Sequence, residues 1–174
     1  ERKNYSVSIR AVAKANNSFL QYYICGQGSE KNSLEKLACN LGISRQVHFL
    51  GFRSDIKELL FASDIFLFTT KQEGLPRSMM EAMASGLPCI ASKIRGNTDL
   101  LEGDNGGFLC EATDVLDYAQ KLNFLANDTD MRRKLGKYNQ INVSNFSYEK
   151  VHNKIKEIYK CLKARSEEHT SELQ

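Results

Sequence analysis

Short apolar runs alternate with helical stretches along most of this sequence, and this alternation constrains the fold more than any other feature. Several of the runs end at a glycine, so each predicts a buried strand followed by a turn. Strands alternating with helices pair in parallel through right-handed crossovers, which predicts an α/β protein with a doubly wound, Rossmann-like parallel sheet. The expected strands are 19–25, 47–50, 65–68, 88–91 and 107–110, and the expected helices are 4–16, 29–42, 54–62, a short helix around Met79, 114–127, 129–145 and 148–163.

Ligands of such sheets bind beyond the carboxyl ends of the strands. The loops at that edge are therefore the places where functional residues are expected. They span residues 26–29, 51–55, 69–78 and 92–98.

Length and charge limit the class of protein. A chain of 174 residues suits one well-buried domain. The net charge of +3 is too small to indicate nucleic acid, and the basic clusters lack the aromatic interleaving that single strands require, so no nucleic-acid partner is expected. No apolar run approaches the ~20 residues of a membrane span, and no signal peptide is visible.

The cysteines indicate a reducing compartment. Their wide spacing excludes a CxxC redox or zinc pattern, and their odd number argues against a disulfide framework. A cytosolic protein is therefore expected. The five cysteines are Cys25, Cys39, Cys89, Cys110 and Cys161.

Both ends of the sequence are unusual. It begins with Glu1-Arg2-Lys3 and has no initiator methionine, which predicts a piece of a longer protein. Residues 165–174 are polar and aperiodic, and they resemble a translated sequencing-adapter read-through. We therefore expect a domain over residues 1–164 and a non-native or disordered tail over 165–174.

A loop that turns directly into a short apolar helix stands out in the middle of the chain. Pro76 presets the backbone, and the free amides of Arg77 and Ser78 form a first-turn anion site. A nucleoside diphosphate held there would have Glu73 and Glu81 on either side, one near the group beyond the phosphates and one near the ribose diol. The other interpretation, an exposed loop acid and a solvated helix face, stays open on these residues alone.

At this point the sequence resembles the family 4 glycosyltransferases, through their paired-glutamate motif and the Glu-Ala-Met-Ala-x-Gly-x-Pro run that begins at Glu81. Those are retaining enzymes of the GT-B fold, in which two Rossmann-like domains face each other across a cleft. The resemblance runs from Lys3 to about residue 163 and covers the C-terminal, donor-binding domain. It implies that the first domain, with the acceptor site, and the first strand of this domain are absent. The matching segments are 47–51, 61–64, 73–88 and 96–97.

The resemblance implies a role for each residue that matches the motif. Glu73 would contact hydroxyls of the transferred sugar and help to place it, and Glu81 would bind the nucleotide ribose. Lys3 matches the lysine that neutralises charge on the leaving diphosphate, so Glu73 and Lys3 are the implied catalytic pair. The remaining implied contacts are Gly74 and Leu75 in the sugar pocket, the Arg77 and Ser78 amides on the diphosphate, Arg53 near the base through main-chain atoms, and Gly26 and Gly28 at a glycine turn near the nucleotide.

Several of these residues also have an ordinary interpretation. Lys3 could be solvated, and Gly26-x-Gly28 also fits a plain turn after a strand. His48 alternates with Val47 and Phe49 and is interpreted as a strand side chain. No histidine or aspartate completes a ligand set beside the two glutamates, so neither a metal nor another cofactor is expected.

The leading hypothesis is a fragment of a hexosyl-type retaining glycosyltransferase that moves a sugar from a nucleotide-diphosphate sugar to an acceptor hydroxyl, in polysaccharide or glycoconjugate biosynthesis. Its partners would be the donor, the missing N-terminal domain and a glycan or lipid-linked acceptor. The enzyme would be cytoplasmic, with a peripheral place at the inner face of the membrane as an option. The fragment alone is expected to be inactive. A GT-B nucleotide-sugar epimerase and a non-catalytic nucleotide- or glycan-binding module are the alternatives.

Overall fold

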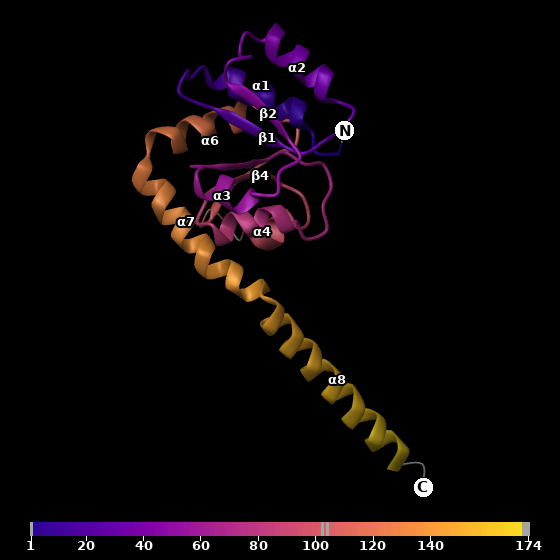
Figure 1. Cartoon of the computed structure of the whole chain (residues 1–174). Helices are drawn as coiled ribbons and strands as arrows, with labels where there is room; N and C mark the ends of the chain where they lie inside the picture. The colour runs from indigo at the N-terminus through magenta and orange to yellow at the C-terminus, as the bar shows by residue number, and fades with distance from the viewer. Residues whose placement is uncertain (1, 102, 104, 172–174) are drawn as a thin grey trace.

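The computed structural model describes residues 2–101, 103 and 105–171. Its strands and helices alternate in a layered body, from which the last helix extends (Figure 1). The predicted alternation is confirmed. In chain order the elements are α1 (Tyr5–Ala15), β1 (Tyr22–Cys25), α2 (Lys31–Asn40), β2 (Val47–Gly51), α3 (Ile56–Phe61), β3 (Phe66–Phe68), α4 (Arg77–Ala84), β4 (Cys89–Ser92), α5 (Asn97–Leu100), β5 (Gly107–Cys110), α6 (Val115–Asn127), α7 (Thr129–Val143), the 3-10 helix η1 (Ser144–Phe146) and α8 (Tyr148–Ser171).

All strand pairs are parallel, as predicted, and their hydrogen bonds group them into two sheets. β1 pairs with β2, while β3, β4 and β5 form a second sheet in that order. Within the described residues no ladder joins β1 to β3. Ile24 of β1, Ile90 of β4 and Val12 of α1 nevertheless belong to one buried cluster. The predicted parallel arrangement is thus present as two groups of strands around a shared core.

Helix α1 covers this core because its apolar residues recur at helical spacing. Val7, Ala11 and Ala15 are four residues apart and all are buried. The helix packs against α6 and α2. It ends where Asn16 adopts a left-handed conformation (φ 50°) and its N–H donates to the Ala13 carbonyl.

Helix α4 packs against β3, β4 and α7 and is buried on the face that meets them. Met79, Ala82 and Met83 have no exposed surface, and burying each methionine contributes about 1.5–3 kcal/mol. Gly136 of α7 allows the close packing, since a Cβ there would lie 1.9 Å from the Gly86 carbonyl oxygen. The prediction of a buried helix around Met79 is confirmed.

Several elements differ from the expected ones; β1, for example, begins at Tyr22 where a start at 19 was expected. The N-cap of α2 is Glu30, one residue after the expected helix start at 29, and the hydroxyl of Ser33 donates to the Glu30 carbonyl at 2.7 Å. The short helix α5 was not predicted, because four residues are too few for a periodic pattern. Helix α8 continues to Ser171, past the expected end at 163. The expectation of a non-native or disordered tail over residues 165–174 stays a prediction.

Helices α6 and α7 begin at aspartates that cap them. The Asp114 carboxylate accepts from the N–H groups of Leu116 and Asp117, and the Asp128 carboxylate accepts from the N–H of Met131 at 2.8 Å. Among the described residues no helix has the length and apolar character needed to span a membrane.

Candidate functional site

The loop that follows β3 is tied to the first residues of the chain by buried polar groups. The hydroxyls of Ser8 and Thr69 are 2.6 Å apart. The N–H of Lys71 donates to the Arg2 carbonyl at 2.9 Å. The start of the chain therefore lies beside the carboxyl end of β3, the edge at which parallel sheets bind ligands.

Lys3 and Glu73 meet at this edge, although 70 residues separate them in sequence. The Lys3 Nζ lies 2.7 Å from Glu73 Oε1 and 5.0 Å from the centre of the Phe68 ring. The Glu73 side chain is only 13% exposed, and a carboxylate so far from water requires a charged partner. The structure thus brings together the two residues predicted to be catalytic.

The N-terminus of α4 follows the same loop. Pro76 precedes the helix in an extended conformation, and its carbonyl accepts from the N–H groups of Met79 and Met80 at 3.1 and 3.2 Å. In the described chain no hydrogen bond from the N–H of Arg77 or Ser78 is found. Two donors at the positive end of the helix dipole are therefore available to an anion, as predicted.

Glu81 lies on α4, one turn from its start. Its side chain is half-exposed, and its Oε1 is 3.7 Å from the guanidinium of Arg77, which is itself almost fully exposed. An exposed pair at this spacing is worth only about 0.3–0.5 kcal/mol. Glu81 is thus a rim residue that can exchange Arg77 for a ligand hydroxyl at little cost.

The predicted glycines lie in open loops. Gly26 has a φ of +130°, which favours glycine, and its N–H donates to the Gly51 carbonyl at 2.7 Å. A Cβ added at Gly26, Gly28 or Gly74 would meet no atom within 4 Å. The loops after β1 and β3 thus leave space beside their backbones. Leu75, the other predicted sugar-pocket residue, is 46% exposed.

Arg53, which follows β2, is engaged by its own neighbour. Its Nε donates to Asp55 Oδ1 at 2.7 Å, and a second hydrogen bond joins the same two side chains. This Arg53 guanidinium holds the pKa of the Asp55 carboxyl below its usual value. The side chain of Arg53 is therefore engaged by Asp55, and a contact of its main chain with a base stays a prediction.

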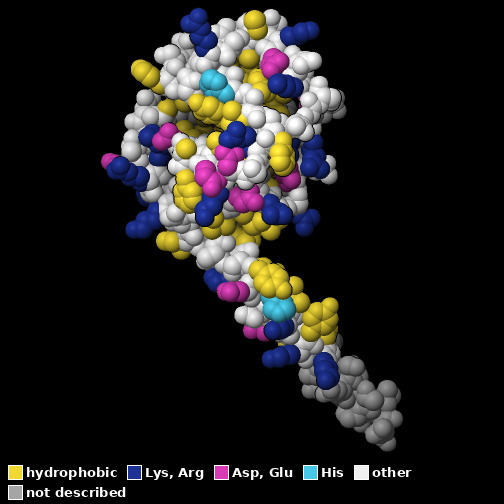
Figure 2. All heavy atoms as spheres, viewed as in Figure 1, with side chains coloured by type: hydrophobic (Ala, Val, Ile, Leu, Met, Phe, Trp, Pro, Cys, Tyr) yellow, Lys and Arg dark blue, Asp and Glu magenta, His cyan; other side chains and the backbone are white. Residues whose placement is uncertain are grey.

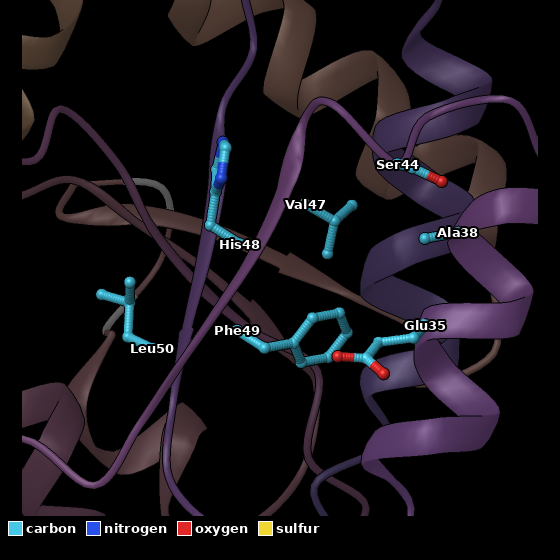
Figure 3. Close-up of a pocket in the computed structure, with 7 residues that line it drawn as sticks. All are labelled: Glu35, Ala38, Ser44, Val47, His48, Phe49 and Leu50. Atoms are coloured by element: carbon cyan, nitrogen blue, oxygen red, sulfur yellow. The ribbon is translucent and has the colours of Figure 1, made fainter.

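A hollow between α2 and β2 is separate from these residues. Figure 3 shows the Val47 and Phe49 side chains on the side of β2 that faces α2, with the Glu35 carboxylate beside the Phe49 ring. His48 points to the opposite side, stacks on Tyr23 with ring centres 4.6 Å apart, and is 2.8 Å from the Gln21 side-chain oxygen. The interpretation of His48 as a strand side chain fits this position. The lining residues are Glu35, Ala38, Ser44, Val47, His48, Phe49 and Leu50.

Sequence reasoning missed the residues that support the loop of Glu73. Gly96 has a φ of +90°, and a Cβ there would lie 2.0 Å from the Gly74 carbonyl oxygen. Thr70 and Ser92 are fully buried, and the Ser92 hydroxyl donates a hydrogen bond to the Thr70 carbonyl. The only sequence signal was the pair Gly96-Asn97, noted as part of a motif and given no role.

No cluster of three or more histidine, cysteine, aspartate or glutamate residues that could hold a metal occurs in the part of the chain that the structure describes. Independence from metals and other cofactors remains a prediction.

Comparison with known proteins identifies the family. The family model for "Glycosyl transferases group 1" matches residues 1–142. The chain belongs to this family. A galactosyltransferase of Escherichia coli, named UDP-Gal:alpha-D-GlcNAc-diphosphoundecaprenol alpha-1,3-galactosyltransferase, is 32% identical over 79% of this chain and 36% of its own length. The putative glycosyltransferase EpsD of Bacillus subtilis is 31% identical over 90% of this chain and 42% of its own length.

Solved structures of glycosyltransferases have the same fold. The Anabaena protein Alr3699/HepE in complex with UDP matches this group 1 chain with a TM-score of 0.85 and 27% identity, over 92% of this chain and 46% of that protein. Staphylococcus aureus TarM matches with a TM-score of 0.86 at 24% identity, which shows the fold alone. The fold is therefore the Rossmann-like C-terminal domain of a GT-B glycosyltransferase. The chain spans less than half the length of these relatives.

Proposed function

We propose that this chain is the donor-binding domain of a retaining, family 4 type glycosyltransferase, which transfers a hexosyl group from a nucleotide-diphosphate sugar to an acceptor hydroxyl. The observation that carries the proposal is the contact between Lys3 and Glu73 beside the free N-terminus of α4. It places a cation, a carboxylate and two unpaired amides at the ligand edge of parallel strands. The Anabaena relative of this fold was solved with UDP and with UDP-glucose.

The leaving diphosphate gains negative charge as its bond to the anomeric carbon breaks. The N–H groups of Arg77 and Ser78 and the Lys3 ammonium act on that charge, because preorganised donors stabilise it most where water is excluded. Lys3 exchanges the Glu73 carboxylate for phosphate when the donor binds. Glu73 then accepts hydrogen bonds from sugar hydroxyls. Glu81, at the rim, accepts from both hydroxyls of the ribose.

A further strand completes the domain between β1 and β3. Within the described residues each of these strands has a ladder partner on one side and none on the other, and the carbonyl of Arg2 accepts from the N–H of Lys71 just beyond β3. A parallel strand that precedes Lys3 would fit this position and join the two sheets. Its pairing would use the backbone groups that β1 and β3 leave without a ladder.

Helix α8 supports the proposal of a preceding Rossmann-like domain. It extends from the body, and Figure 2 shows hydrophobic side chains along it beside lysines. An apolar stripe exposed to this extent marks an interaction surface. We assign it to the missing N-terminal domain, which also holds the acceptor, so the chain alone does not turn over donor. The exposed apolar residues of the helix are Tyr148, Val151, Ile155, Ile158, Tyr159 and Leu162.

The acceptor is a glycan or a lipid-linked glycan, and the enzyme acts in the cytoplasm or peripherally at the inner face of the membrane. The Escherichia coli relative is named for a diphosphoundecaprenol-linked substrate, and a Rhizobium meliloti relative for lipopolysaccharide core biosynthesis. These names support a role in polysaccharide or glycoconjugate biosynthesis.

The test is calorimetric titration of the chain with UDP, GDP and their glucose conjugates. A wild-type chain that binds one nucleotide, and a Glu81→Ala variant that binds it about 10-fold more weakly through loss of charge-assisted hydrogen bonds, would support the proposal. In the full-length enzyme, Glu73→Ala should mainly lower turnover. Equal affinity of wild type and Glu81→Ala, or no binding of any of the four ligands, would contradict it.

A further inference from the structure

We propose that Thr70, Ser92 and Asn97 form a buried hydrogen-bonded chain that positions the Glu73 carboxylate and leaves one of its oxygens free for the donor sugar. The role toward the sugar rests on the proposed function. The contacts themselves do not depend on it.

The series of hydrogen bonds begins at Asn97, the first residue of α5. This side chain has no exposed surface, and its Nδ2 donates to the Ser92 carbonyl at 2.8 Å and lies 3.1 Å from Ser92 Oγ. Its Oδ1 has no hydrogen-bond partner among the described residues, a cost of about 1–3 kcal/mol.

Ser92 and Thr70 continue this series of hydrogen bonds from β4 to the loop after β3. Ser92 ends β4, and its hydroxyl donates to the carbonyl of Thr70, which lies two residues beyond β3. Both residues are fully buried. The Thr70 carbonyl is thus held by Ser92 of β4, and Ser92 is held in turn by Asn97 of α5.

Thr70 then reaches Glu73. Its hydroxyl has one proton to donate and lies 3.3 Å from Glu73 Oε1, 3.2 Å from the Arg2 carbonyl and 3.3 Å from the Gln72 carbonyl, so three acceptors share that proton. Lys3 donates to the same carboxylate oxygen, Oε1, at 2.7 Å. For Glu73 Oε2 no hydrogen bond is found in the described part of the chain. Oε1 therefore has two protein partners, of which Thr70 remains when Lys3 turns to the diphosphate, and Oε2 is the oxygen available to a sugar hydroxyl.

Gly96 supports the same loop from an adjacent point. It immediately precedes Asn97, and its Cα lies so close to the Gly74 carbonyl that any Cβ would overlap it. The end of β4 and the loop before α5 thus contact the Glu73 loop through the Ser92 hydroxyl and through Gly96.

The first test needs no ligand. A carbodiimide forms an amide directly between an amine and a carboxylate in contact, so its product between Lys3 and Glu73, measured by peptide mass spectrometry, reports where the carboxylate lies. Thr70→Val should lower the yield about fivefold, the factor for one hydrogen bond of about 1 kcal/mol. Ser92→Ala should lower it in the same direction, and Thr70→Ser should restore it.

Ser63→Ala is the matched control, because Ser63 also donates to a backbone carbonyl, that of Leu59 at 2.7 Å, but just after α3 and away from the site. Its yield should equal the wild-type yield. Thermal unfolding of every variant separates a displaced carboxylate from a destabilised fold. Unchanged yield in both Thr70→Val and Ser92→Ala overturns the proposal.

The second test addresses the sugar. Affinities are measured for UDP alone and for UDP-glucose, and their ratio gives the contribution of the sugar. Thr70→Val should reduce that ratio about fivefold and leave the affinity for UDP within twofold of wild type, whereas a general loss of structure would weaken both. An unchanged ratio in Thr70→Val contradicts the role in sugar binding. If the wild type binds neither ligand, the proposed function is wrong, and the cross-linking yields still decide whether Thr70 and Ser92 position Glu73.

Discussion

Replacement of Gly96 by alanine should disturb the Glu73 loop more than any comparable change elsewhere in the chain. Gly96 has a φ of +90°, and a Cβ there would lie 2.0 Å from the Gly74 carbonyl oxygen and 3.2 Å from that of Glu73. Two costs therefore add. Backbone strain costs about 1–2 kcal/mol, and overpacking against a backbone carbonyl costs about 1–3 kcal/mol.

The total expected loss is about 2–5 kcal/mol of unfolding free energy, measured by urea denaturation. Gly42→Ala is the matched control, because Gly42 has a φ of +73° and no atom within 4 Å of an added Cβ. It should cost only the strain, about 1–2 kcal/mol. Equal losses in the two variants would show that Gly74 does not lie against Gly96 and would refute the account of the loop.

Two further predictions concern the rest of the domain. Asp128→Ala should cost about 1 kcal/mol in urea denaturation, since it removes the N-cap of α7, whereas the exposed neighbour Asp130→Ala should change stability by less than about 0.5 kcal/mol; equal effects would contradict the cap. With iodoacetamide at pH 8, the exposed Cys39 and Cys161 should react fastest. The pKa of the Cys25 thiol is raised, mainly by burial, so Cys25 should react more slowly, and UDP should slow it further, because Cys25 precedes the Gly26 turn. Faster reaction of Cys25 than of Cys39, by mass spectrometry, would count against this assignment.

Much of the architecture follows from local patterns. Strands such as β4 are short and mostly apolar, and helices such as α1 and α6 have apolar residues at helical spacing, so both types were predictable within a few residues. The lack of a ladder between β1 and β3 in the described residues was not predictable from such patterns, because strand pairing depends on the whole chain. The cap of α2 also escaped prediction, since several residues before the helix could serve.

The candidate site was predictable in part. The turn at Pro76 and the free amides of Arg77 and Ser78 follow from the chemistry of a helix start. The meeting of Lys3 with Glu73 does not follow from any local pattern, and it entered only through the resemblance to a family. Ser92 gave no signal, and Asn97 gave one only as part of the Gly96-Asn97 motif, because a buried serine or asparagine looks like a loop residue until its tertiary partners are known.

The position of the diphosphate tests the central claim most directly. In a crystal structure of this chain with the nucleoside diphosphate that binds best, we expect phosphate oxygens within about 3 Å of the Arg77 and Ser78 amides and of Lys3 Nζ, with the ribose hydroxyls on Glu81. A nucleotide in the hollow lined by Glu35 and Phe49, or a diphosphate away from the start of α4, would contradict the account.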